Sequence, residues 1–201
     1  MEVIDISSNI SWENLFKWQS FPDIKYEKSL ENWNCCNISK LNNLNSHLWA
    51  HIDFPFHILK NWKKSGEYEF SKFYWECYVI EIIEWINIKD KIINLDLTDK
   101  ILLIKTVNLN NKNDDYFFLK EEDTDFIISK WIKNIWVDTF SIDWFWNMDF
   151  TNHNNFFLND ILIYEWLELS KVEEWKYYFF WLPLKINWLE ASLVRAFLLK
   201  L

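Results

Sequence analysis

The chain has 201 residues and is 50% hydrophobic, which is enough for one packed domain and excludes a disordered tail. Its 21 basic and 30 acidic residues give a net charge of -9, the wrong sign for a protein that neutralises nucleic-acid phosphates or lies on an anionic membrane. The first residues lack the basic and apolar regions of a signal peptide, and no apolar run reaches the roughly 18 residues that cross a bilayer. We therefore expect a cytoplasmic protein without nucleic-acid or membrane partners.

Short runs of β-branched and aromatic residues predict strands along the chain. In chain order these runs are residues 3–6, 78–83, 101–107, 161–164 and 177–182. A helix is predicted from Asp123, where apolar side chains follow at near-helical spacing, and it leads into a short strand at 135–137. Residues 193–199 predict a closing strand. No linker, repeat or charge block divides the chain, so residues 1–201 are expected to form a single α/β domain with a mixed sheet.

Glycine and tryptophan occur in abnormal numbers. The chain has 1 glycine and 15 tryptophans, whereas a chain of this length would ordinarily have about 14 glycines at the usual share of roughly 7%. Several tryptophans stand in polar turns or at a helix end, where glycine is the ordinary residue: Trp62, Trp131, Trp175 and Trp188. We hypothesise that many tryptophans are glycines in the cell, encoded by UGA codons that the organism reads as glycine. The alternative is a tryptophan-rich surface that binds carbohydrates or aromatic ligands.

Three of the four histidines lie in the segment HLWAHIDFPFH, residues 47–57. The proline in this segment excludes a helix through it and favours an extended chain. Side chains alternate along an extended chain, so four of them are expected on one face: His47, His51, Asp53 and His57. Three imidazoles and a carboxylate suit zinc, manganese or a similar divalent ion. The alternative is a half-exposed strand whose histidines are satisfied by hydrogen bonds.

Position 49 has to allow a bend within this segment. In a fully extended chain the Cα atoms of His47 and His51 would lie about 13 Å apart, whereas two ligand nitrogens of one metal lie within about 4 Å of each other. An indole ring at Trp49 would resist the bend and occupy the space of the metal, and glycine would do neither. This position is the strongest sequence argument for the codon hypothesis.

The histidine segment resembles the HxGTHxDxPxH signature of the metal-dependent cyclase family. The similarity spans nearly the whole chain in the family's order, and the other matching segments are residues 5–7, 12–18, 73–80, 136–143, 165–167, 182–185 and 191–196. Tryptophan stands for the family's glycine at positions 12, 18, 49, 75, 136 and 166. Ala50 replaces the motif threonine and Leu193 replaces a proline, and neither is an expected ligand.

The resemblance implies a swivelling β/β/α fold and a homodimer or larger homo-oligomer. It also implies two metal ions, with zinc expected and manganese as the alternative. The first ion would be bound by His47, His51 and Asp53. Asp53 and Glu165 would bridge to a second ion that His153 also holds.

The implied reaction is hydrolysis of an amide bond of a small aryl amide by a metal-activated water, with His57 as general acid/base. The first expected substrate is N-formyl-L-kynurenine, cleaved to L-kynurenine and formate in tryptophan catabolism; another amide, a lactam or a lactone is the alternative. Phe16 would stack on an aryl substrate or cover the core. Three polar residues are expected to be structural: Asp138, Ser141 and Asp143. An interpretation from another class is a non-catalytic, tryptophan-rich ligand-binding protein whose histidines are structural.

Overall fold

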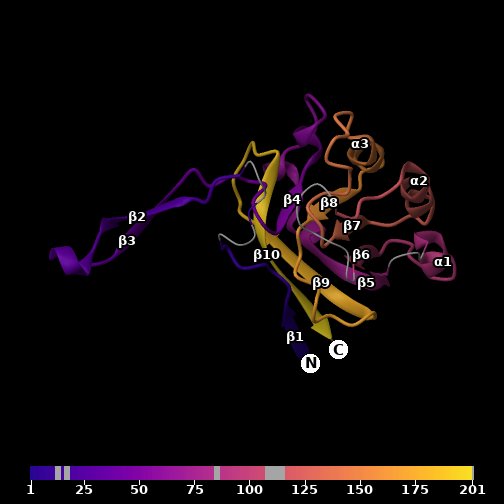
Figure 1. The fold of residues 1–201 in the computed structure, drawn as a ribbon, viewed down its shortest axis with the longest axis horizontal. Coiled ribbons are helices and arrows are strands. Elements are labelled where there is room, and N and C mark those ends of the chain that lie inside the picture. Colours follow the sequence, from indigo (N-terminus) through magenta and orange to yellow (C-terminus); the bar gives the residue numbers. More distant parts are fainter. Residues whose placement is uncertain (12–14, 16–18, 84–86, 107–115, 201) are drawn as a thin grey trace.

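Most of the chain folds around one mixed β-sheet (Figure 1). A computed structural model describes residues 1–11, 15, 19–83, 87–106 and 116–200. The strands of the sheet are β1 (Glu2–Asp5), β4 (His51–Asp53), β5 (Tyr74–Ile82), β6 (Ile101–Thr106), β7 (Asn134–Val137), β8 (Leu162–Glu165), β9 (Lys176–Pro183) and β10 (Ala191–Lys200). Their order is β1-β10-β4-β8-β7-β6-β5-β9, and because β9 also pairs with β10 the sheet closes on itself like a barrel.

The strands β5 to β8 are parallel to one another and are connected through helices. The connecting helices are α1 (Ile88–Ile92), α2 (Glu121–Ser129) and α3 (Thr151–Leu158). All three lie on the same side of the sheet (Figure 1). Parallel strands of this kind are buried on both faces, which explains the apolar run that begins β6. Ile101 and Leu103 pack in the core that β9 and β10 also line, whereas Leu102 and Ile104 pack with the helices.

The α/β class and the strand-rich mixed sheet predicted from the sequence are confirmed. Each predicted strand has a counterpart within the described residues, and the predicted helix corresponds to α2, which begins two residues earlier than expected. The sequence did not predict α1, which is little more than one turn, or α3, whose residues TNHNNFFL include few strong helix formers. None of the described helices has the length and apolarity that crossing a bilayer requires.

Two strands outside the main sheet form a hairpin that projects away from it (Figure 1). They are β2 (Asp23–Lys28) and β3 (Ile38–Asn42). In their register Ile24 faces Leu41 and Tyr26 faces Ser39, so exposed apolar side chains share one face of the hairpin. Neither strand is predicted from the sequence, because four of the six residues of β2 are charged and the apolar residues of β3, Ile38 and Leu41, do not alternate.

Left-handed backbone conformations are concentrated at tryptophans. Ten described non-glycine residues have positive φ, and five of them are Trp33 (φ 60°), Trp49 (53°), Trp131 (57°), Trp166 (68°) and Trp188 (77°). Four others are asparagines or aspartates, which tolerate this region. A bulky residue there is a genuine outlier, whereas glycine adopts the conformation without steric cost. These five positions therefore have the backbone geometry of glycine sites.

Two of the expected glycine-like turns differ from the expectation. At the turn of residues 61–62 it is Asn61, with φ 66°, that adopts the left-handed conformation and not Trp62. Trp175 likewise has no positive φ. Trp131 follows the C-terminal residues of α2, as predicted for a glycine that ends a helix. The backbone thus supports the codon hypothesis at Trp131 and Trp188 and does not support it at Trp62 and Trp175.

Candidate metal centre

The segment with three histidines is less extended than the sequence analysis predicts. Only His51–Asp53 is a strand, and Pro55–His57 forms a 3-10 turn with the proline at its start. The expectation of an extended chain over residues 47–57 therefore holds for residues 51–54, including Phe54 before the proline, and is wrong on either side of them. Proline is accepted at the first position of a helix, because its missing N–H would have no partner there. The chain bends on both sides of β4, and these bends bring the histidines together.

Trp49 makes the bend that precedes β4. Its φ of 53° confirms that the chain turns at this position. Its ring is buried, with 2% exposure, and contacts Phe21 edge-on at 5.9 Å between ring centroids. The ring is not part of the lining of the cavity beside the histidines, so the expectation that it would occupy the space of the metal is wrong. Its buried Nε1 has no hydrogen-bond partner, a defect that glycine would not have.

Strand register places two of the expected ligands side by side. β4 and β8 are antiparallel neighbours in which His51 lies opposite Glu165. The backbone N–H of Ile142 donates to Glu165 Oε1 at 2.9 Å and fixes that carboxylate. His153 reaches the same place from α3, which lies between β7 and β8 in the chain. Residues that are distant in sequence therefore meet at the ends of adjacent central strands.

Asp53 lies between the imidazoles, and its two carboxylate oxygens face different histidines. Its Oδ1 is 3.1 Å from His47 Nδ1 and 3.4 Å from His51 Nε2. Its Oδ2 is 3.5 Å from His153 Nε2. Glu165 spans the same two groups, because its oxygens are 3.6 Å from His51 Nε2 and 3.5 Å from His153 Nε2. Asp53 and Glu165 therefore both lie between His51 and His153.

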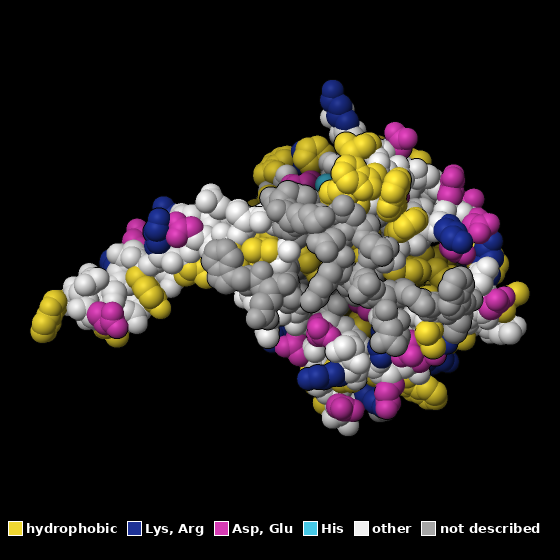
Figure 2. Space-filling view, in the orientation of Figure 1, with side chains coloured by type: hydrophobic (Ala, Val, Ile, Leu, Met, Phe, Trp, Pro, Cys, Tyr) yellow, Lys and Arg dark blue, Asp and Glu magenta, His cyan; other side chains and the backbone are white. Residues whose placement is uncertain are grey.

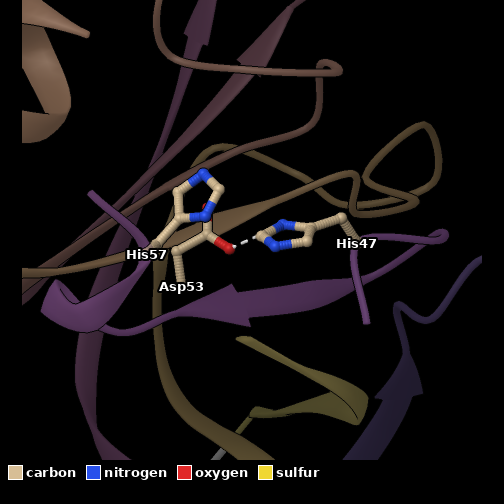
Figure 3. Close-up of side chains that lie close together, drawn as sticks. All are labelled: His47, Asp53 and His57. Carbon is tan, nitrogen blue, oxygen red and sulfur yellow. Dashed lines mark ion pairs between the residues drawn. The ribbon is translucent and has the colours of Figure 1, made fainter. Parts of the chain in front are cut away.

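His57 lies beside these groups and lines the same cavity as the other histidines. Figure 3 shows His47 and His57 on two sides of Asp53, with the ion pair from His47 to Asp53 drawn as a dashed line. The ring of His57 is 4.4 Å from that of His47 and 5.8 Å from that of His153, measured between centroids. Ligand atoms of His47, Asp53 and His57 all lie within 4.8 Å of one another. The five expected ligands and the expected acid/base are thus gathered in one place.

The imidazoles fall into two classes by proton affinity. Burial alone would lower the pKa of His47, but the carboxylates beside it, Asp53 first, outweigh burial and raise the pKa to about 10. His153 is raised to a pKa of about 10 in the same way. Burial and the neighbouring imidazoles lower the pKa of His51 and that of His57 to about 4. His51 and His57 are therefore neutral at pH 7, the state in which a histidine can donate a lone pair.

The two central carboxylates also differ. Burial would raise the pKa of Asp53, but the imidazoles of His51 and His47 hold it well below the usual range. Burial and the adjacent Asp53 raise the pKa of Glu165 to about 8. Two carboxylates at one buried place repel each other unless a positive charge lies between them.

The donor set fits a divalent cation. His51 Nε2 and both oxygens of Asp53 are buried and have no hydrogen-bond partner. Buried polar atoms without hydrogen bonds are costly, and buried charged groups in proteins are paired or bind metals. Imidazole nitrogens and carboxylate oxygens are ordinary ligands of zinc and manganese. The chemistry and the unpartnered atoms therefore indicate a metal centre at these residues.

A cavity of about 220 Å³ opens beside the centre. One wall contains the histidines and Glu165, and the rest is largely apolar and aromatic: Tyr116, Phe140, Trp144, Phe145, Met148 and Phe150. Figure 2 shows a small histidine area with hydrophobic side chains next to it. The cavity is thus suited to a small ligand with an apolar ring and a polar group turned toward the centre.

Some expected site residues lie elsewhere or have other surroundings. Phe16 falls outside the described residues. Asp138 accepts hydrogen bonds from the backbone and hydroxyl of Thr106. Asp143, expected to be structural, lies 2.6 Å from His153 Nδ1. Glu190, which the sequence analysis did not single out, lies 3.4 Å from His47 Nε2. Asp143 lies in a segment that carries the family resemblance, whereas no sequence pattern marks Glu190.

Comparison with known proteins finds relatives that match nearly the full length of the chain. No family model matches the chain. A kynurenine formamidase of Bacillus cytotoxicus is 28% identical over 202 residues, which cover 97% of this chain and 96% of the relative. A kynurenine formamidase of Bacillus mycoides is 28% identical over 200 residues, with 96% and 95% covered.

Solved structures share the fold at lower identity. A structure described as a predicted metal-dependent hydrolase from Bacillus stearothermophilus has a TM-score of 0.79 and 21% identity, covering 98% of this chain and 97% of its own. Isatin hydrolase A from Ralstonia solanacearum has a TM-score of 0.73 and 13% identity, with 99% and 92% covered. The resemblance to the metal-dependent cyclase family is confirmed. The matches support a hydrolase of this family rather than a non-catalytic binding protein.

Proposed function

We propose that the protein is a metal-dependent amidohydrolase that converts N-formyl-L-kynurenine to L-kynurenine and formate. The observation that carries the proposal is the position of Asp53, whose two oxygens face His51 on one side and His153 on the other. Similarity over nearly the full length to proteins named kynurenine formamidase supports the choice of substrate.

Two ions, zinc first and manganese as the alternative, would be held by residues already gathered here. His47, His51 and Asp53 would hold the first, and Asp53, Glu165 and His153 the second. A divalent ion supplies Lewis-acid polarisation of the scissile carbonyl and lowers the pKa of the attacking water. The buried carboxylates offset the ionic charge, and the apolar walls exclude other water.

His57 would act as general acid/base. Its ring lines the cavity and lies next to His47 and Asp53, within reach of a water in front of the carboxylates. From that position its imidazole accepts a proton from the water and returns it to the leaving amine nitrogen. Three other imidazoles of the described residues line this cavity, those of His47, His51 and His153. Each of them faces Asp53 or Glu165 in an ion pair, so His57 is the one left to transfer protons.

The aromatic walls of the cavity fit the aryl part of the substrate. Phe140, Phe145 and Phe150 present ring surface within the same cavity as the metal ligands. Offset or edge-on contact between aromatic rings contributes about 0.5–1.5 kcal/mol beyond the burial of area. An aryl amide bound there would have its carbonyl toward the ligands and its ring against these side chains.

A cyclic amide or lactone is the second candidate substrate. Isatin hydrolases share the fold with this chain, although their identity to it is only 12 to 13%. A cavity with apolar walls and one polar end accommodates a fused aromatic ring as well as an open-chain aryl amide. Direct competition of the two substrate types therefore belongs in the test.

The test uses the purified protein loaded with zinc or manganese. Release of formate from N-formyl-L-kynurenine is measured before and after chelation, with isatin as the comparison substrate. Formate release that chelation abolishes supports the proposal. Cleavage of isatin alone would move the substrate to the cyclic amides, and a folded protein that binds no metal would overturn the hydrolase itself. Glu165→Gln should lose activity, whereas Glu76→Gln, which changes a surface carboxylate paired with Lys100, should retain it.

A further inference from the structure

Each of the three imidazoles at the centre is anchored through the ring nitrogen that faces away from it. His51 Nδ1 lies 2.8 Å from the carbonyl oxygen of Trp49. His153 Nδ1 lies 2.6 Å from Asp143 Oδ2. His47 is turned the other way: Nδ1 faces Asp53, and Nε2 faces Glu190 at 3.4 Å. An oxygen that accepts from one ring nitrogen leaves the lone pair of the other for a metal and fixes the ring orientation.

Asp143 is itself held rigidly. Its Oδ1 accepts hydrogen bonds from the backbone N–H of Asn152 and from the side chain of Asn147. Its Oδ2 accepts from the backbone N–H of His153 as well as facing the His153 ring. The residue is 2% exposed. Its carboxylate thus joins the first turn of α3 to the imidazole that the helix presents.

Glu190 is fixed from two directions. The hydroxyl of Ser46 donates to Glu190 Oε1 at 2.6 Å. The backbone N–H of Phe54 donates to the carbonyl oxygen of Glu190 at 2.8 Å, which joins the residue to the chain just after β4. Glu190 therefore faces the Nε2 side of the His47 ring, while Asp53 faces its Nδ1 side.

We propose that Asp143 and Glu190 are positioning residues that act on separate ions, Asp143 through His153 and Glu190 through His47. The proposal rests on the metal centre of the proposed function, but not on its substrate. Loss of a carboxylate behind a ligating histidine typically weakens metal binding by about 10- to 100-fold. We therefore expect each variant to weaken one of two binding events and to leave the other unchanged.

The experiment is calorimetric titration of the metal-free protein with cobalt(II), whose absorption also reports the ligand set. Asp143→Asn should weaken one binding event by about 10- to 100-fold, and Glu190→Gln the other. Glu76→Gln is the matched control and should change neither, because its carboxylate pairs with Lys100 at the surface. Unchanged binding in both carboxylate variants, or a wild type that binds no cobalt, would overturn the proposal.

A double-mutant cycle separates positioning from a purely structural role. Asp143 also caps the first turn of α3, so its substitution could loosen the helix. If it acts through the ring, Asp143→Asn causes no further loss of cobalt affinity in a His153→Ala background. An equal loss in both backgrounds would contradict the assignment. Glu190→Gln in a His47→Ala background is tested in the same way. Cobalt binding that follows this pattern in a protein inactive on N-formyl-L-kynurenine would reject the substrate and keep the positioning roles.

Discussion

His51 on β4 lies opposite Glu165 on β8, and its Nε2 is 3.6 Å from Glu165 Oε2. The two residues are far apart in the sequence and meet because their strands are antiparallel neighbours in the centre of the sheet. Strand register, rather than loop conformation, thus fixes this part of the centre. Sites on regular elements are held more precisely than sites on loops.

Asp53→Asn should remove metal and activity together. The substitution keeps the shape of the side chain but removes the charge that faces both groups of histidines. We expect neither ion to bind at stoichiometric concentration and hydrolysis to fall to background. Metal analysis after gel filtration and formate release check this. Asp160→Asn is the control, because Asp160 lies at the surface in an ion pair with Lys72. Two bound ions in Asp53→Asn would contradict the shared role of Asp53.

His57→Ala should keep the metal and lose the rate. His57 lines the cavity, and three other described histidines supply the ion pairs to Asp53 and Glu165. Loss of a general acid/base typically lowers kcat by about 10²- to 10⁴-fold. Metal content and kcat are measured on the same preparation. Full turnover would show that another group transfers the proton, and loss of metal would show that His57 is a ligand.

Stability should depend on pH through Asp138. Burial is the main cause that raises the pKa of Asp138 to about 7, against an ordinary value of 3.8. The folded protein thus binds this proton more tightly than the unfolded chain does. The unfolding free energy contributed by this group should be complete below pH 4 and should fall as pH rises to about 7.

Asp138→Asn isolates this effect, because asparagine mimics the protonated acid. Each tenfold change in proton affinity is worth about 1.4 kcal/mol, so the variant should be more stable than the wild type by roughly 1–4 kcal/mol at pH 8 and similar at pH 4. Urea denaturation at the two pH values measures the difference. A difference that does not change with pH would show that the carboxyl titrates normally.

Trp131→Gly should stabilise the protein, and Trp175→Gly should not. Both rings are exposed, but only Trp131 has a left-handed backbone. Relief of a strained conformation is worth about 1–3 kcal/mol, whereas glycine at an ordinary position costs roughly 0.5–1 kcal/mol. Urea denaturation of the two variants gives the comparison. Equal effects would mean that the left-handed backbone at Trp131 stores no strain.

Peptide mass spectrometry of the protein from its own organism tests the codon hypothesis directly. Glycine masses are expected at the five tryptophans with a left-handed backbone, which are Trp33, Trp49, Trp131, Trp166 and Trp188. UGG codons at these positions would refute the hypothesis. The chain rebuilt with glycine at 12, 18, 49, 75, 136 and 166 should then be the less stable form, because Trp136 fills a buried space against Tyr164.

The sequence by itself determined the ligand types and most of the sheet. Residues 47–57 contain three imidazoles and a carboxylate whatever local conformation the segment adopts, so the ligand types can be recognised without the structure. Buried strands such as β6 are continuous apolar runs, so composition reveals them. The same composition argument found that glycine was missing, and positive φ at Trp49, Trp131 and Trp188 agrees with it.

Only the tertiary structure decided how these residues meet. The extended chain expected around Pro55 is a 3-10 turn, and the ring of Trp49 turns away from the site into the core. Asp143 and Glu190 became visible only beside the histidines they face, because a hydrogen-bond partner depends on distance in space and not on spacing in the chain. Local sequence fixes which groups a segment offers, whereas packing of distant segments fixes which groups share one place.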